Sequence, residues 1–176
     1  WKQLDIQLKR LVKAPIYIDE TPGITLTEFV AKAKRLVREK GVKIIFVDYL
    51  QLMHSGKPQA GGFSKVQEVT EISNTLKTTA KELNIPIIAL AQLNRNLMSR
   101  MGSNGKPVLS DLKDSGSIEQ DADIVVFLHR PGLIGLAEDP DEQAKTEVIF
   151  AKNRNGQVGS VEMRYVGHLM KFEDVQ

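Results

Sequence analysis

Asp48 is the residue whose position most clearly suggests chemistry, because it directly follows the apolar run 44–47. An uninterrupted run of β-branched and aromatic residues is typical of a strand that is buried on both faces of a parallel sheet. An acid at the end of that strand lies at the carboxyl edge of the sheet, where open α/β folds bind ligands. A carboxylate there can hold Mg²⁺ together with phosphate oxygens and water. The alternative is a core strand that ends in a solvated or helix-capping Asp, and the pattern alone favours it.

A second polar residue, Gln92, ends another apolar run at residues 85–91. If the two runs form neighbouring parallel strands, Gln92 lies beside Asp48 on the same edge of the sheet. A neutral amide there can donate a hydrogen bond to a phosphate and accept one from a loop without changing its charge. The alternative is that Gln92 only satisfies backbone groups of the loop that follows.

Two cations, Lys152 and Arg154, flank Asn153 where a predicted strand at residues 146–152 meets a turn with the sequence Asn155-Gly156. The Asn-Gly pair predicts a β-hairpin, with a second strand at residues 158–165. A guanidinium group binds phosphate bidentately and stabilises charge in phosphoryl transfer. The alternative is a solvated basic hairpin, which is the more common fate of Lys and Arg on a turn.

The elements that position these residues alternate between helices and strands. Periodic apolar residues predict helices near residues 4–12, 26–40 and 67–83, the second with Thr25 or Thr27 as its N-cap and Gly41 at its end. Short apolar runs predict strands at residues 16–18, 43–47, 85–91 and 124–128, and a further short strand near residues 169–172. The order predicts an α/β fold with a mostly parallel sheet flanked by helices and an antiparallel C-terminal hairpin.

The composition is that of an ordinary globular domain. The chain has 176 residues, of which 41% are hydrophobic and 26% charged, and we expect residues 1–176 to form a single domain. A net charge of +2 gives no overall field for nucleic acid, so any such site is local. Cysteine is absent, which excludes disulfides and thiolate metal sites and is compatible with a cytoplasmic protein. No apolar stretch is long enough to span a membrane.

Five stretches occur in an order that resembles one family. They are FVDYLQLM, QEVTEIS with the following LK, IPIIALAQLNR, SDLKDSGSIEQDADIV and AKNRNGQVG. Together they resemble the motor domain of the bacterial replicative DNA helicases, the DnaB family, from about Pro15 onward. The resemblance implies a RecA-like P-loop NTPase core and a homo-hexameric ring around single-stranded DNA. It also implies ATP and Mg²⁺ as cofactors, 5′–3′ unwinding, and a primase and a helicase loader as partners at cytoplasmic replication forks, without a membrane.

The same resemblance assigns roles to the four polar residues. Asp48 matches the Walker B aspartate that holds magnesium. Gln92 matches the residue that couples the phosphate state to the DNA-binding loop that follows it. Lys152 and Arg154 match residues that act on ATP bound to the neighbouring subunit, with Arg154 as a finger supplied in trans.

A further set of residues is expected to contact DNA. Lys113, Asp114 and Gly116 match the family's loop that holds the DNA backbone, where the family often has Arg-Glu in place of Lys113-Asp114. Glycine and backbone N–H groups allow a close approach to phosphate, and lysine adds charge. Arg95 and Arg100 precede this loop in a basic, glycine-containing segment, together with Lys106. The alternative for these three is a solvated charge, and the loops carry no aromatic platform for base stacking.

Other acidic residues are interpreted as structural. Glu119, Asp121 and Asp123 resemble a helix-to-strand junction of the family and have no histidine partner in the sequence. Glu68 and Glu71 are expected to face solvent or a neighbouring subunit.

One expected motif is missing. The pattern G-x-x-x-x-G-K-[ST], which cradles a triphosphate, does not occur in the 176 residues. We expect it upstream of Trp1 with the candidate general base, so that the chain is an incomplete motor domain with uncovered apolar surface and little ATPase activity of its own. The alternative is a RecA-like module that binds single-stranded DNA or a partner without catalysis.

Overall fold

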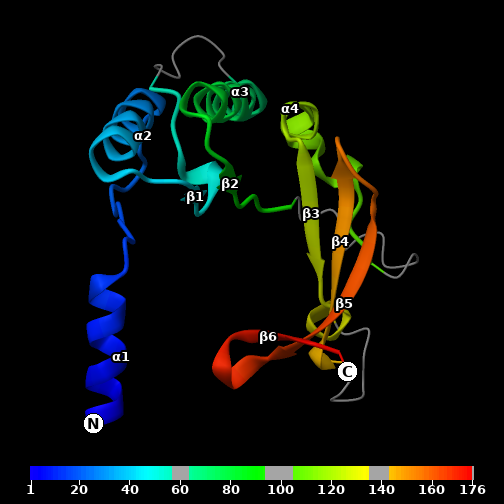
Figure 1. Ribbon diagram of the computed structural model, residues 1–176. Helices are drawn as coiled ribbons and strands as arrows, with labels where there is room; N and C mark the ends of the chain where they lie inside the picture. Colours follow the sequence, from blue (N-terminus) through cyan, green and yellow to red (C-terminus); the bar gives the residue numbers. More distant parts are fainter. Residues whose placement is uncertain (57–63, 94–104, 135–142, 176) are drawn as a thin grey trace.

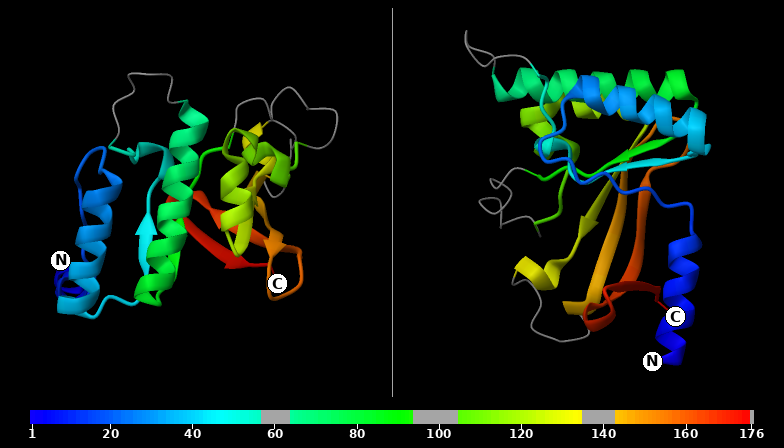
Figure 2. Two further views of the ribbon diagram at one scale, coloured as in Figure 1. Left: turned by 90° about the horizontal axis from the view of Figure 1, so that it is seen from above. Right: turned by 90° about the vertical axis from the view of Figure 1, so that its left-hand side faces the viewer.

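The computed structural model describes residues 1–56, 64–93, 105–134 and 143–175. These residues form α-helices and two small sheets (Figure 1). The helices that follow the first one lie side by side over the strands, whereas the first helix projects away from them (Figures 1 and 2). The helices are α1 (Lys2–Lys13), α2 (Leu26–Lys40), α3 (Lys65–Leu83) and α4 (Gly116–Asp121).

Helix α2 forms where the sequence predicts it because both of its ends are encoded locally. The Thr25 hydroxyl accepts a hydrogen bond from the Glu28 N–H at 3.3 Å, and the Glu28 carboxylate accepts one from the Thr25 N–H at 3.0 Å. This capping box satisfies two N–H groups that the first turn leaves unpaired. Gly41 ends the helix in the left-handed region at φ 66°, where a side chain would be strained.

Helix α3 begins at Lys65, two residues earlier than predicted, because Ser64 and Gln67 form a second capping box. Its buried side chains, among them Val69 and Ile72, pack with Phe29 of α2 in one hydrophobic cluster. The helix ends at Asn84, which adopts a left-handed conformation at φ 52°. Helix α3 therefore lies between α2 and α4 and holds the helical layer together.

The strands β1 (Ile45–Val47) and β2 (Ile87–Ala89) pair in parallel, as the sequence predicts. Ile45 and Val47 pack against the hydrophobic cluster under α2 and α3. Phe46 is 64% exposed and Ile88 45% exposed, so the prediction of burial on both faces is wrong. The physical reason is that alternate side chains point to opposite faces, and in the described part of the chain helices cover one face only.

The second sheet is antiparallel, in the order β3 (Ile124–His129), β4 (Lys145–Asn153), β5 (Gly159–Val166) and β6 (Lys171–Asp174). The predicted hairpin is the β4–β5 pair, and β6 is the predicted additional strand. Along β3 the burial alternates, with Val125 and Phe127 buried and Val126 and Leu128 exposed. One face of this sheet thus packs on a second cluster that includes Leu112.

The α/β class is confirmed, but the balance of strands differs from the prediction. Among the described strands two pair in parallel and four antiparallel, because β3 joins the C-terminal hairpin rather than the β1–β2 pair. The predicted strand at residues 16–18 is absent, and Ile16 and Ile18 are 62% and 81% exposed. An isolated apolar triplet without a neighbouring strand has no ladder of hydrogen bonds to join. No helix in the described ranges is long and apolar enough to cross a membrane.

Candidate functional site

Asp48 and Gln92 follow the carboxyl ends of the paired strands β1 and β2, so the structure brings them to one edge as predicted. The pairing continues past the strands, since Leu90 N–H donates to Val47 O at 2.9 Å and Leu50 N–H donates to Leu90 O at 2.8 Å. Both side chains are exposed, and within the described residues neither makes a hydrogen bond or an ion pair. Two exposed polar groups at the edge of a parallel pair can receive a ligand from solvent.

The donor set at this edge fits one kind of metal. Within the described ranges, no cluster of three or more His, Cys, Asp or Glu residues could hold a metal ion. Asp48 by itself cannot form a protein cage of the type that binds calcium. A single exposed carboxylate does fit Mg²⁺, which keeps several waters and takes further oxygens from phosphates. Asp48 is therefore the residue that would hold magnesium.

The Gln92 backbone is held by a side chain that the sequence analysis did not single out. Gln51 lies in a single 3-10 turn (Leu50–Leu52) after Asp48. Its amide nitrogen donates to Gln92 O at 3.0 Å, and its amide oxygen accepts from Gln92 N–H at 3.2 Å. We call this contact the Gln51–Gln92 amide pair. It commits the Gln92 backbone and leaves the Gln92 side chain available.

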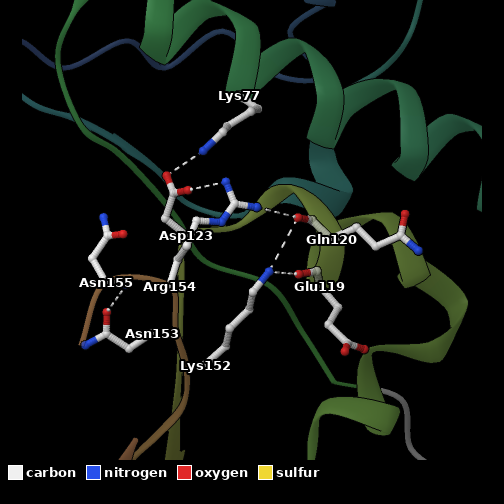
Figure 3. A network of polar contacts seen from close by, with 8 residues as sticks. All are labelled: Lys77, Glu119, Gln120, Asp123, Lys152, Asn153, Arg154 and Asn155. Carbon is white, nitrogen blue, oxygen red and sulfur yellow. Dashed lines mark hydrogen bonds and ion pairs between the residues drawn. The ribbon is translucent and has the colours of Figure 1, made fainter. Parts of the chain in front are cut away.

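Lys152 and Arg154 lie on the other sheet, where β4 ends, and both reach the C-terminus of α4 (Figure 3). The Lys152 ammonium donates to Glu119 O at 2.6 Å and to Gln120 O at 3.4 Å. The Arg154 guanidinium donates to Gln120 O at 3.5 Å. The last carbonyls of a helix have no partner within it and carry a partial negative charge, so two cations stabilise this end.

Asp123 holds Arg154 in the same network (Figure 3). The Arg154 N–H donates to Asp123 O at 2.9 Å, and the guanidinium lies 3.1 Å from the Asp123 carboxylate. Lys77 of α3 donates to that carboxylate as well. The hydrogen bond from Lys77, aided by the charge of Arg154, holds the pKa of Asp123 below its ordinary value. The Arg154 side chain is nevertheless 51% exposed, so its guanidinium remains accessible from outside the molecule.

Helix α4 connects these cations to the predicted DNA-contacting loop. Lys113 and Asp114 lie in a 3-10 helix (Leu109–Ser115), and Gly116 is the first residue of α4. The loop and the two cations therefore occupy opposite ends of one short helix. Ser73 of α3 donates to the Asp121 carboxylate at 2.8 Å and fixes α4 on the helical layer.

The remaining predicted cations are Arg95, Arg100 and Lys106. Arg95 and Arg100 belong to residues 94–104, which lie outside the described residues. Lys106 forms an ion pair with Glu147 at 2.7 Å and lowers the pKa of that carboxyl, so it is engaged at β4.

The prediction that Glu68 faces solvent or a neighbouring subunit is wrong. Glu68 is only 5% exposed, and its carboxylate accepts a hydrogen bond from Ser55 N–H at 3.4 Å. Lys65 and His54 lie 3.6 and 3.5 Å from it. The hydrogen bond and the nearby cation let a carboxylate occupy the buried face of α3.

The comparison with protein families decides what the domain is. The family model described as DnaB-like helicase C terminal domain matches residues 1–174. The chain belongs to this family. It is 42% identical over 177 residues to a protein of Geobacillus stearothermophilus named replicative DNA helicase DnaB, and 43% identical over 179 residues to one of Bacillus subtilis named replicative DNA helicase DnaC. Each alignment covers all of this chain and 37% of the relative, so the chain spans about a third of the length of these proteins.

Solved structures agree with the DnaB-like assignment. A solved ATPase domain superposes with a TM-score of 0.88 at 32% identity, covering 100% of this chain and 60% of that one. A DnaB-like replicative helicase, solved in a study of its interactions with primase, superposes with a TM-score of 0.86 at 32% identity, covering 100% and 41%. The DnaB-like domain described here therefore has the RecA-like α/β fold.

Two contacts of this DnaB-like domain were not predicted from the sequence, and the reason is the same for both. Gln51 binds the backbone of a residue 41 positions away, and Asp123 binds Arg154 across two strands. No local pattern distinguishes either side chain from a solvated one. Only the pairing of β1 with β2 and of β3 with β4 brings the partners together.

Proposed function

We propose that this chain is part of the motor domain of a replicative DNA helicase that unwinds duplex DNA by ATP-driven 5′–3′ translocation on single-stranded DNA. The observation that carries the proposal is the pair of exposed polar side chains, Asp48 and Gln92, at one edge of a parallel strand pair in a DnaB-like domain. That edge is where α/β nucleotide hydrolases place the metal and the terminal phosphate.

Within this proposal the two residues have separate tasks. The Asp48 carboxylate would hold Mg²⁺, directly or through water, and a bound ion would supply charge stabilisation to the phosphates. The Gln92 amide detects the terminal phosphate by donating a hydrogen bond without changing its own charge. The exposure of both side chains and the fixed backbone of Gln92 support these roles.

Lys152 and Arg154 act on the nucleotide of a neighbouring subunit. The Arg154 side chain makes an exposed hydrogen bond to Gln120 O and a half-exposed ion pair with Asp123, contacts that cost little to exchange for a phosphate. Lys152 would exchange a partly buried hydrogen bond to Glu119 O. A trans contact requires an oligomer, and we propose a homo-hexameric ring, with a primase and a loader as its partners. A solved DnaB-like helicase whose interactions with primase were studied supports this part.

The DNA backbone is contacted by the loop that contains Lys113, Asp114 and Gly116, with Arg95 and Arg100 contributing charge. A glycine at the start of α4 allows phosphate to approach backbone N–H groups closely. Helix α4 begins at this loop and ends where Lys152 and Arg154 bind its carbonyls. The same helix therefore connects the proposed DNA contacts with the two cations that are proposed to act on the neighbouring subunit.

The test is the ATPase rate of the full-length natural protein with and without single-stranded DNA. We expect DNA to raise the rate, and Asp48→Ala to lower it by about 100-fold or more, since even outer contacts to a metal are worth about 10- to 100-fold. As a matched control, Asp5→Ala removes an exposed carboxylate of α1 and is expected to change nothing. A protein that binds DNA without hydrolysing ATP would instead be a non-catalytic binding module.

A further inference from the structure

The Gln51–Gln92 amide pair extends the hydrogen bonding between β1 and β2 beyond the last backbone hydrogen bond of the two segments. On β2 the backbone groups that face β1 belong to alternate residues. Pro86 O accepts from Ile45 N–H at 3.1 Å, and Leu90 both donates to Val47 O and accepts from Leu50 N–H. The next residue on that side is Gln92. By then the chain after β1 has turned into the 3-10 turn (Leu50–Leu52), so no backbone group of it binds Gln92 within the described residues.

The side chain of Gln51 supplies the hydrogen-bonding groups that the backbone of β1 would supply if the strand continued. A primary amide carries a C=O acceptor and N–H donors, the same two kinds of group that the backbone of a strand would offer. Gln51 satisfies both backbone groups of Gln92, with distances of 3.0 and 3.2 Å. The N–H and C=O of one residue point to the same side when its backbone is extended, so the contact favours an extended backbone at Gln92, beyond the end of β2.

The consequence lies in the direction of the Gln92 side chain. Because its backbone is held, the exposed Gln92 side chain starts from a fixed Cα–Cβ bond at the edge of the sheet. Only two residues separate Asp48 from Gln51 in the sequence. The segment that would hold the metal and the segment that would detect the phosphate are therefore mechanically joined through the amide pair.

We propose that Gln51 is a positioning residue that fixes the Gln92 backbone beside Asp48, so that the Gln92 side chain can detect the terminal phosphate. This inference rests on the proposed function. In this role Gln51 acts through the Gln92 backbone and not by contacting the nucleotide or the metal.

The first experiment measures the amide pair itself, in the full-length natural protein, by hydrogen exchange of the Gln92 amide. Gln51→Leu removes both hydrogen bonds, and we expect exchange to become about three- to tenfold faster, the scale of one net hydrogen bond. Gln51→Glu keeps an acceptor for the Gln92 N–H, so its exchange rate should lie between those of wild type and Gln51→Leu. Gln7→Leu, the same change on exposed α1, is the control and should leave the rate unaltered.

The second experiment measures the consequence by DNA-stimulated ATP hydrolysis. We expect Gln51→Leu to lower kcat about tenfold and to leave KM for ATP within about twofold, because the contact matters for phosphate detection rather than for ground-state binding. In the Gln92→Ala background the same substitution should have no further effect, since a residue that acts through Gln92 has nothing left to position.

The outcomes separate the inference from the function on which it rests. Unchanged exchange at Gln92 in Gln51→Leu, or equal losses from Gln51→Leu in the wild-type and Gln92→Ala backgrounds, would overturn the inference while the helicase function stands. A wild-type protein without DNA-stimulated hydrolysis would overturn the proposed function and the positioning role with it, whatever the exchange rates are.

Discussion

Replacing Arg154 by alanine should abolish DNA-stimulated ATP hydrolysis without unfolding the domain. The change removes a guanidinium that, in its own chain, makes one ion pair with Asp123 at 3.1 Å and one long hydrogen bond to Gln120 O at 3.5 Å. The backbone hydrogen bond from Arg154 N–H to Asp123 O at 2.9 Å remains in the variant. The strand end therefore keeps its position, and only the side-chain contacts are lost.

The magnitudes decide which effect dominates. The two side chains of the ion pair are 51% and 53% exposed, and pairs of this kind contribute about 0–1 kcal/mol. Losing it should lower the melting temperature by no more than about 2–4 °C in a domain of this size. A finger acting in trans accelerates phosphoryl transfer by about 10³–10⁵. At 1.36 kcal/mol for each factor of ten, this corresponds to about 4–7 kcal/mol. The free energy lost from transition-state stabilisation, about 4–7 kcal/mol, should thus exceed the free energy lost from folding, about 0–1 kcal/mol, several-fold.

The assay compares Arg154→Ala with Arg38→Ala in the full-length natural protein. Arg38 is an exposed arginine with one ion pair, to Glu39 at 3.7 Å, and serves as the matched control. Mixing Arg154→Ala subunits with Asp48→Ala subunits should restore part of the activity, because a site between two subunits can then combine an intact Asp48 with an intact Arg154. Retention of more than about a tenth of the DNA-stimulated rate by Arg154→Ala would refute the finger role. A mixture no more active than its components would refute the placement in trans.

Three further predictions concern the chain itself. The 176 residues alone should hydrolyse ATP at no more than about 1% of the full-length rate, because they contain no phosphate-cradling loop, and a faster rate in a coupled assay would contradict this. Thr25→Ala should lower the free energy of unfolding by about 1 kcal/mol in urea denaturation, whereas the exposed Thr27→Ala should not. Hydrogen bonds from Lys32 and Thr21 lower the pKa of Asp19 to about 2, so its contribution to stability is present above the ordinary value of 3.8 and is lost as the pH falls through 2. An NMR titration of Asp19 with a midpoint near 3.8 would disagree.

Helices whose ends are determined by nearby capping residues were predictable from the sequence. Thr25, Glu28 and Gly41 are close along the chain to the helix they delimit, and α2 has the predicted bounds. The strands were less predictable, because their extent depends on a partner. The run at residues 85–91 forms a strand only at Ile87–Ala89, and the triplet at residues 16–18 forms none.

In the candidate site, too, some features were predictable from the sequence and others depend on contacts between distant segments. Asp48 and Gln92 could be placed together because the carboxyl ends of two neighbouring parallel strands meet at one edge. The present partners of Arg154 could not be predicted, because Asp123 and Gln120 reach it only through the pairing of β3 with β4. Their contacts are modest in energy, so they hold the side chain in place without preventing it from leaving.

The most direct test of the account is unwinding of a forked duplex by the full-length natural protein. One substrate carries a free 5′ single-stranded tail and a blocked 3′ tail, and the other has the reverse arrangement. We expect ATP- and Mg²⁺-dependent strand separation that requires the 5′ tail and is lost in Asp48→Ala and Arg154→Ala. Binding to both forks without strand separation, or unwinding that persists in both variants, would contradict it.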